Sequence, residues 1–184
     1  LPLAALTAWQ ALIDTAHVAA GTKVLVIGAA GGVGHLAVQI AKSRGAQVTA
    51  VVSTANTDFA RSLGADEVID RTKADFTAAV RDLDVVLDTV GAELVPALDC
   101  LRSGGTLVAL SPRAYAAARE EAERRGIRAA TLLVEADRLG MTEIADLAAA
   151  KQLVPAVDAT YPLEQAGAAQ ESRPSHGKIV LVVP

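Results

Sequence analysis

The sequence predicts an α/β fold, a doubly wound parallel sheet of the Rossmann type, with helices on both faces in three αβα layers. Short apolar runs alternate with amphipathic segments along most of the 184 residues, which is the pattern of repeated βαβ units. Hydrophobic residues make up 52% of the chain but aromatic residues only 3%, so small aliphatic side chains must build the core, as in buried parallel strands. A glycine-rich string at residues 28–34 lies between a short apolar run and an amphipathic segment, as expected for the turn between a strand and a helix.

The first elements follow from the spacing of apolar residues. Residues 3–13 predict an amphipathic helix, and the continuous apolar run 23–27 predicts a fully buried strand. Residues 33–44 predict a second helix, with His35 and Gln39 among the polar residues opposite its apolar stripe, and Gly45 ends it.

The same alternation continues to residue 150. Strands are expected at residues 47–52, 67–69, 84–87, 106–110 and 129–134. Helices are expected at residues 57–63, 76–81, 93–101, 115–125 and 142–150. Residues 1–150 should therefore form one domain, which begins with the predicted helix at residues 3–13. Residues 151–184 break this rhythm with two extended pieces around a short helix at 163–170, so we expect them to belong to a second structural unit.

Composition and charge exclude several classes of function. A net charge of −4 gives no basic field for nucleic acid, and no apolar run approaches the roughly 18 residues of a membrane span. Cys100 is the only cysteine and the three histidines are far apart, so we expect no metal site. No signal peptide is recognised, which favours the cytoplasm. A first residue of Leu1 instead of Met indicates a piece of a longer protein.

The glycine-rich turn carries the main functional prediction. Its spacing is G-x-x-G-x-x-G, with Ala29 in place of one glycine of the standard fingerprint, and it lies between a predicted strand and a predicted helix. Glycines let the backbone approach a ligand closely, and the helix N-terminus offers free N–H groups to a pyrophosphate. A turn without a ligand is the less favoured interpretation.

The end of the second predicted strand favours NADPH over NADH. Domains that bind NAD usually place Asp or Glu there, about 20 residues beyond the glycines, to bind the ribose 2′-hydroxyl. This chain has Ser53 and Thr54 instead, and the next carboxylate is Asp58. A carboxylate would repel a 2′-phosphate, so its absence suits NADPH. Arg71, after the third strand, is either a cation for this phosphate or a solvated loop residue, and both interpretations stay open.

Several segments carry a family resemblance: LTAW (6–9), VLVIGAAGGVG (24–34), LAVQIAK (36–42), LGADEVID (63–70), DVVLDTVG (84–91), GGTLV (104–108) and GKIVL (177–181). Together they resemble the medium-chain dehydrogenase/reductase superfamily, and most closely its zinc-independent quinone oxidoreductase (zeta-crystallin-like) branch. Two departures concern the 2′-phosphate, because Ala55 and Asn56 stand where relatives often carry Lys or Arg, and Arg71 where they often have Tyr.

The resemblance implies a cofactor site built from the turn, from several strand ends and from the N-terminal linking helix at residues 3–13. The turn would hold the pyrophosphate, the end of the second strand the adenosine ribose, and the remaining residues the nicotinamide and its ribose. The implied residues are Thr7, Ala30, Gly31, Gly32, Val33, Ser53, Thr54, Asp88, Thr89, Val90, Leu110, Ser111, Leu133 and Val134.

The resemblance also implies a GroES-like substrate domain before Leu1, to which residues 151–184 would return. Any zinc ligands and most substrate contacts would lie in that domain. The isolated chain should therefore bind cofactor but turn over weakly or not at all. A homodimer is expected through the predicted edge strand 129–134, which begins with Ala129.

The function we expect is NADPH-dependent reduction of a small-molecule substrate, a quinone or an activated alkene. Two alternatives stay open: an enoyl reductase or zinc-type alcohol dehydrogenase of the same superfamily, and a non-catalytic nucleotide-binding module. No general acid or base can be named, because the hydride comes from the cofactor. We interpret His35 as a surface residue, His176 as a loop residue and Cys100 as a core thiol.

Overall fold

The computed structural model describes residues 1–91 and 94–183, and its main feature is a six-stranded sheet in the order β3-β2-β1-β4-β5-β6. All neighbouring strands of this sheet are parallel. The strands are β1 (Lys23–Ile27), β2 (Gln47–Val52), β3 (Glu67–Asp70), β4 (Leu83–Asp88), β5 (Leu101–Ala109) and β6 (Arg128–Thr131). This order confirms the predicted doubly wound Rossmann fold.

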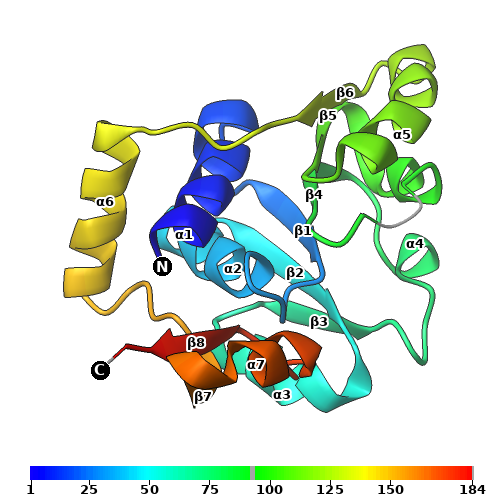
Figure 1. The fold of residues 1–184 in the computed structure, drawn as a ribbon. Coiled ribbons are helices and arrows are strands. Elements are labelled where there is room, and N and C mark those ends of the chain that lie inside the picture. The colour runs from blue at the N-terminus through cyan, green and yellow to red at the C-terminus, as the bar shows by residue number, and fades with distance from the viewer. Residues whose placement is uncertain (92–93, 184) are drawn as a thin grey trace.

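Helices cover both faces of the sheet, with α1 and α2 on one face and α5 on the other (Figure 1). The α-helices of this part of the chain are α1 (Pro2–Trp9), α2 (Gly34–Ser43), α3 (Thr57–Ser62), α4 (Phe76–Ala79), α5 (Pro112–Arg124) and α6 (Arg138–Ala149). A π-helical segment, Gln10–Thr15, continues α1, and two 3-10 helices are η2 (Thr54–Asn56) and η3 (Pro96–Cys100). The three-layer prediction is therefore confirmed.

Successive residues of a strand divide the core into two clusters. In β1, Val24 and Val26 pack on the side of α1 and α2, whereas Leu25 and Ile27 pack on the side of α5. This division follows from the period of two in a strand, and it explains why the run is apolar without interruption.

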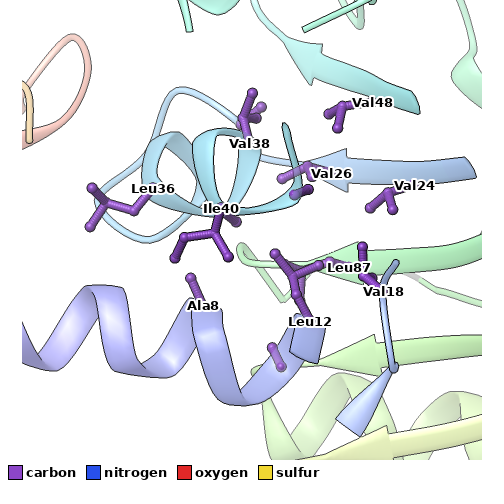
Figure 2. Close-up of a cluster of buried hydrophobic side chains, with 14 of the residues drawn as sticks. Ala8, Leu12, Val18, Val24, Val26, Leu36, Val38, Ile40, Val48 and Leu87 are labelled. Atoms are coloured by element: carbon purple, nitrogen blue, oxygen red, sulfur yellow. The ribbon is translucent and has the colours of Figure 1, made fainter. Parts of the chain in front are cut away.

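Figure 2 shows the first cluster between the N-terminal helical segment, α2 and the sheet. Leu12 of the π-helical segment and Ile40 of α2 are both fully buried, and Leu87 of β4 lies next to Leu12. Each such side chain contributes roughly 1.5–3 kcal/mol of apolar burial. This packing fixes α2, and with it the turn from which α2 begins.

Two helices begin earlier than their apolar periodicity predicts, because polar side chains cap them. The Ser111 hydroxyl accepts a hydrogen bond from the amide of Ala114 at the start of α5. The Asp137 carboxylate accepts hydrogen bonds from the amides of Leu139 and Gly140 at the start of α6. Each cap satisfies amides that the first helical turn leaves free.

Two predicted elements are shorter in the structure. β6 ends at Thr131, so the second half of the predicted strand 129–134 is a loop in which Leu133 is 87% exposed. The predicted helix 93–101 is replaced by the 3-10 helix η3, and Glu93 lies outside the described residues.

The C-terminal segment forms a separate two-stranded parallel sheet, drawn in orange and red in Figure 1. Its elements are β7 (Val157–Pro162), the 3-10 helix η4 (Leu163–Gln165), α7 (Ala166–Glu171) and β8 (Lys178–Val182). The amide of Gly177 donates a hydrogen bond of 2.8 Å to the carbonyl of Ala30, which fastens this sheet to the glycine turn. Across residues 1–91 and 94–183, no helix is both long and apolar enough to cross a membrane.

Candidate functional site

A cleft of about 470 Å³ opens at the carboxyl ends of β1 and β2, a volume typical of small-molecule sites. The strand order reverses between β1 and β4, and ligands of open α/β sheets bind beside such a switch point. Six of the predicted site residues line this cleft: Ala30, Gly31, Gly32, Ser53, Arg71 and Val90. A cleft of about 490 Å³ beside Lys23 and Gln47 lies at the opposite, amino ends of the strands and does not have this relation to the switch point.

Two glycines make the turn between β1 and α2 possible. Gly28 has a φ of +80°, a conformation that residues with a Cβ rarely adopt, and its amide donates to the carbonyl of Val51 on β2. A Cβ on Gly34 would collide with the carbonyl oxygen of Gly28. The first glycine therefore turns the chain, and the last lets α2 begin against the end of β1.

The turn presents amides that the protein does not use. Among the described residues, no acceptor takes the backbone N–H groups of Gly32, Val33 or Gly34, which lie at the N-terminus of α2. Unpaired amides and the positive end of a ten-residue helix favour an anion at this point. This arrangement suits the pyrophosphate of a dinucleotide.

A cation from the C-terminal sheet lies at the same turn. A Cβ on Gly32 would be only 2.6 Å from the Nζ atom of Lys178, the first residue of β8. No carboxylate within residues 1–91 and 94–183 forms a salt bridge with this ammonium group. Lys178 was not predicted as a site residue, although its motif GKIVL carries the family resemblance, because nothing in the local sequence indicates that β8 returns to the turn.

The far end of the cleft combines Ser53 and Arg71 with residues of the C-terminal loop. The Asn56 side chain donates a hydrogen bond of 2.9 Å to the carbonyl of Ser175, which joins η2 to this loop. His176 lines the cleft as well, and its ring packs against Phe59 with 4.2 Å between the centroids and 37° between the ring planes. His176 lies in a loop as predicted, but its place in the cleft was missed.

Thr54 does not line this cleft, because its hydroxyl is turned to Asp70 at the end of β3. The distance from Thr54 Oγ1 to the Asp70 carboxylate is 2.5 Å, and hydrogen bonds from Thr54 and Thr72 hold the pKa of that carboxyl well below its usual range. Lys73 pairs with the same carboxylate at 3.3 Å. The prediction for the ribose site rested on the end of β2 alone, whereas β3 brings the Asp70 carboxylate next to that strand end because Val52 and Asp70 are in register.

Asp88, at the end of β4, organises the loop on the other side of the turn. Its buried carboxylate accepts hydrogen bonds from the amides of Val90 and Gly91, at 3.2 and 2.9 Å. The Thr89 hydroxyl donates to the carbonyl of Ile27, at 2.8 Å. Asp88 and Thr89 therefore shape the rim of the cleft, and Val90, which is 61% exposed, projects from it.

The interpretation of His35 as a surface residue is wrong. His35 is fully buried and Gln39, one turn further along α2, is 9% exposed, because residues 154–156 cover the polar face of this helix. The periodicity identified that face correctly, but a polar face is exposed only when no later segment of the chain packs on it.

The remaining predicted site residues lie outside the lining of the cleft. The Thr7 hydroxyl bonds the carbonyl of Leu3 within α1, and Ser111 caps α5. The amide of Leu110 donates to the Asp88 carbonyl. The two that follow β6, Leu133 and Val134, are in an open loop.

Two other groups are separate from the cleft. Cys100 is fully buried, as predicted for a core thiol, and burial raises the pKa of its thiol to about 11. No group of three or more His, Cys, Asp or Glu side chains in the described part of the chain could hold a metal ion.

The fold and the cleft define a dinucleotide-binding domain of the dehydrogenase type. The family model described as zinc-binding dehydrogenase matches residues 63–181, and the chain belongs to this family, within the medium-chain dehydrogenase/reductase superfamily. A model described as the C-terminal domain of alanine dehydrogenase/PNT matches residues 9–99. The family consists of nicotinamide-dinucleotide-binding oxidoreductases, although the described residues themselves provide no zinc site.

Individual relatives agree with this assignment. The chain is 47% identical to the polyketide synthase GfsB of Streptomyces halstedii over 111 residues, 59% of this chain and 2% of that protein. It is 41% identical to 2-methylene-furan-3-one reductase of Solanum lycopersicum over 113 residues, 60% of this chain and 29% of that protein. The quinone oxidoreductase of Coxiella burnetii superimposes with a TM-score of 0.92 and 32% identity, over 100% of this chain and 59% of that one. The chain thus spans only part of each relative.

Proposed function

We propose that the protein binds NADPH and belongs to an oxidoreductase that reduces an activated alkene or a quinone. The observation that carries this proposal is the composition of the cleft. It joins an amide-rich turn to a strand end, Ser53, that bears no carboxylate, and two basic side chains, Arg71 and His176, line the same cleft. A 2′-phosphate needs cations and tolerates no anion in contact with it.

Asp158, 3.6 Å from the ring of His176 but not itself in the lining of the cleft, is one nearby carboxylate that opposes a 2′-phosphate, and Asp70 is another. The Asp70 carboxylate is occupied by Thr54, Thr72 and Lys73, and it does not line the cleft, whereas Arg71 does. The balance of charge facing the ligand therefore favours NADPH over NADH.

In the proposed reaction, the residues of this chain bind and orient the cofactor and supply the electrostatic field around its phosphates. The amides after Gly31 and the ammonium of Lys178 would bind the pyrophosphate. Asp88 holds the loop of Val90 in place for the nicotinamide end. When bound, the nicotinamide supplies a hydride. We further propose that residues 1–150 form the cofactor domain and that residues 151–184 join a substrate domain of the longer protein.

The substrate class is inferred from relatives that share this domain. The tomato relative is named as a reductase of 2-methylene-furan-3-one, whose carbon–carbon double bond is conjugated with a ketone, and the Coxiella relative as a quinone oxidoreductase. Both names describe an electron-poor, conjugated acceptor of a hydride. The hydride that reduces such an acceptor comes from the nicotinamide.

A second candidate is an enoyl reductase unit of a polyketide synthase, favoured by the identity of 47% with GfsB. Such a unit acts on an unsaturated acyl thioester. The protein that contains this chain should be assayed with a conjugated ketone, a quinone and a trans-2-enoyl thioester. A preference for the thioester would favour the second candidate.

The cofactor is tested first by calorimetric titration with NADPH and NADH. We expect NADPH to bind at least tenfold more tightly, and the isolated chain to show little or no turnover. Binding of neither nucleotide would refute the proposal, and equal binding of both would refute its NADPH specificity. Turnover by the 184 residues at the rate of an intact relative would contradict the role of a missing substrate domain.

A further inference from the structure

His35 lies beneath the glycine turn and makes two hydrogen bonds that fix its tautomer. Its Nδ1 atom is 2.8 Å from the carbonyl oxygen of Gly31, and its Nε2 atom is 3.2 Å from the amide nitrogen of Ala156. A carbonyl oxygen can only accept and a backbone amide can only donate, so Nδ1 carries the proton and Nε2 accepts. The ring is therefore neutral, and it is fully buried.

The two partners of His35 are far apart in the chain. Gly31 belongs to the turn, and Ala156 directly precedes β7. Gln39 repeats this link one helical turn later, because its side chain accepts from the amide of Val154 at 2.8 Å and donates to the carbonyl of Val154 at 3.0 Å. Together these side chains fasten residues 154–156 to α2.

The fastened segment leads into the sheet that returns to the cleft. Ala156 itself touches the returning strand, because its carbonyl accepts a hydrogen bond of 3.0 Å from the amide of Lys178. The neighbouring amide of Gly177 binds the carbonyl of Ala30, and the Lys178 ammonium lies over Gly32. A continuous path of hydrogen bonds therefore joins His35, Ala156 and the cation at the turn.

We propose that His35 is a positioning residue for the cofactor, which holds Ala156 and thereby places the Lys178 ammonium over the phosphate-binding turn. This inference rests on the proposed nicotinamide cofactor. His35 itself touches no ligand, since its two ring nitrogens are both engaged by backbone groups.

The surroundings keep the ring in the neutral form that the link requires. Burial lowers the pKa of His35, and the positive charge of Lys178 acts in the same direction, opposed by the hydrogen bond to Gly31. A protonated ring would present two donors and would lose the acceptor for Ala156.

Two substitutions separate the two bonds of His35. His35→Asn keeps a donor near the position of Nδ1 but removes the acceptor for the Ala156 amide. His35→Gln keeps an acceptor near the position of Nε2. We expect His35→Asn to weaken NADPH binding about tenfold, as for the loss of one buried hydrogen bond, and His35→Gln to stay within about threefold of the unsubstituted protein.

A double-mutant cycle with Lys178→Met tests whether His35 acts through the cation. If it does, His35→Asn should change the dissociation constant of NADPH less than twofold once Lys178 is already Met. The proposal would be overturned if the double variant weakened NADPH binding by the product of the two single effects, because His35 and Lys178 would then act independently. Unchanged NADPH binding by His35→Asn alone would overturn it as well. If the unsubstituted protein binds no NADPH, the proposed function fails instead, so the two failures are distinguishable.

A second variant keeps the test decisive if His35→Asn does not fold. Gln39→Met removes both bonds to Val154 and the bond from the Gln39 amide to the His35 carbonyl, but it keeps the His35 side chain. We expect it to weaken NADPH binding severalfold in the presence of Lys178 and less than twofold with Lys178→Met. Circular dichroism and thermal unfolding of each variant establish that it is folded, and an equal loss in both backgrounds would contradict the proposal.

Discussion

The ammonium group of Lys178 lies over the α-carbon of Gly32, so that a methyl group on this glycine would be 2.6 Å from Nζ. The two residues come from different parts of the fold, since Gly32 lies in the turn after β1 and Lys178 begins β8. In the proposed pyrophosphate site, the turn that follows β1 of the large sheet is therefore joined by a lysine of the small sheet. A helix N-terminus alone offers amides and a partial charge, and the lysine adds a full charge.

Lys178→Met should weaken NADPH and NADH alike, because both carry the pyrophosphate. A charge-assisted contact of this kind corresponds to a loss of about tenfold or more in affinity. Calorimetric titration of both nucleotides checks this result. Lys23→Met is the matched control, because Lys23 lies at the opposite, amino end of β1. A loss confined to NADPH would assign Lys178 to the 2′-phosphate instead.

Arg71→Ala should act on NADPH alone, because only NADPH carries a 2′-phosphate. Arg71 lines the cleft together with Ser53, and we expect its removal to reduce the ratio of NADPH to NADH affinity about tenfold. Arg61→Ala serves as the control, since Arg61 is exposed on α3 and pairs with Asp58. If the binding of both nucleotides weakens equally, Arg71 supports the shape of the cleft and does not contact the 2′-phosphate.

Most of the fold could be predicted from local patterns in the sequence, namely apolar runs and the positions of glycines. Residues 24–27 of β1 are an uninterrupted apolar run because they are buried on both faces of the sheet, and Gly34 ends the turn because a Cβ there would meet the Gly28 carbonyl. The first residues of the helices were less predictable from the sequence. α6 depends on the capping carboxylate of Asp137, a polar residue that an apolar period does not register.

The site was predicted in part, and the missing part has one cause. Gly31, Ser53 and Arg71 lie at the ends of strands or in the turn, where the Rossmann order places them together. His176 and Lys178 come from a segment more than a hundred residues away, and no local pattern states where that segment docks. The burial of His35 was missed for the same reason.

Gly34→Ala should destabilise the fold and reduce cofactor binding together. The added methyl group would collide with the carbonyl of Gly28, which is backbone and cannot rotate away. We expect the free energy of unfolding to fall by about 1–3 kcal/mol, as for overpacking. Gly167→Ala in α7 is the matched control, because open space surrounds Gly167 and alanine there should stabilise by about 0.5–1 kcal/mol. Chemical denaturation of both variants gives the comparison.

Cys100 should react with thiol reagents only when the protein opens. The thiolate is the reactive form, and burial raises the pKa of this thiol to about 11, so at pH 8 almost all of it stays protonated. Reaction with an aromatic disulfide reagent should be slow in native buffer at pH 8 and rapid in denaturant. Fast stoichiometric reaction in native buffer would show that the second core cluster, which contains Cys100, opens readily.

We propose that two copies of the protein associate through β6, the last strand of the large sheet. An edge strand offers unpaired backbone groups, and a twofold axis beside it would continue the sheet across both copies and cover Leu133, which is 87% exposed. Sedimentation should find a dimer, and Leu133→Glu should raise its dissociation constant at least tenfold because association would bury the new charge. Leu163→Glu, on the C-terminal sheet, should leave the dimer unchanged. A monomeric unsubstituted protein would contradict the proposed dimer. Equal effects of both substitutions would show that the contact between the copies does not lie at β6.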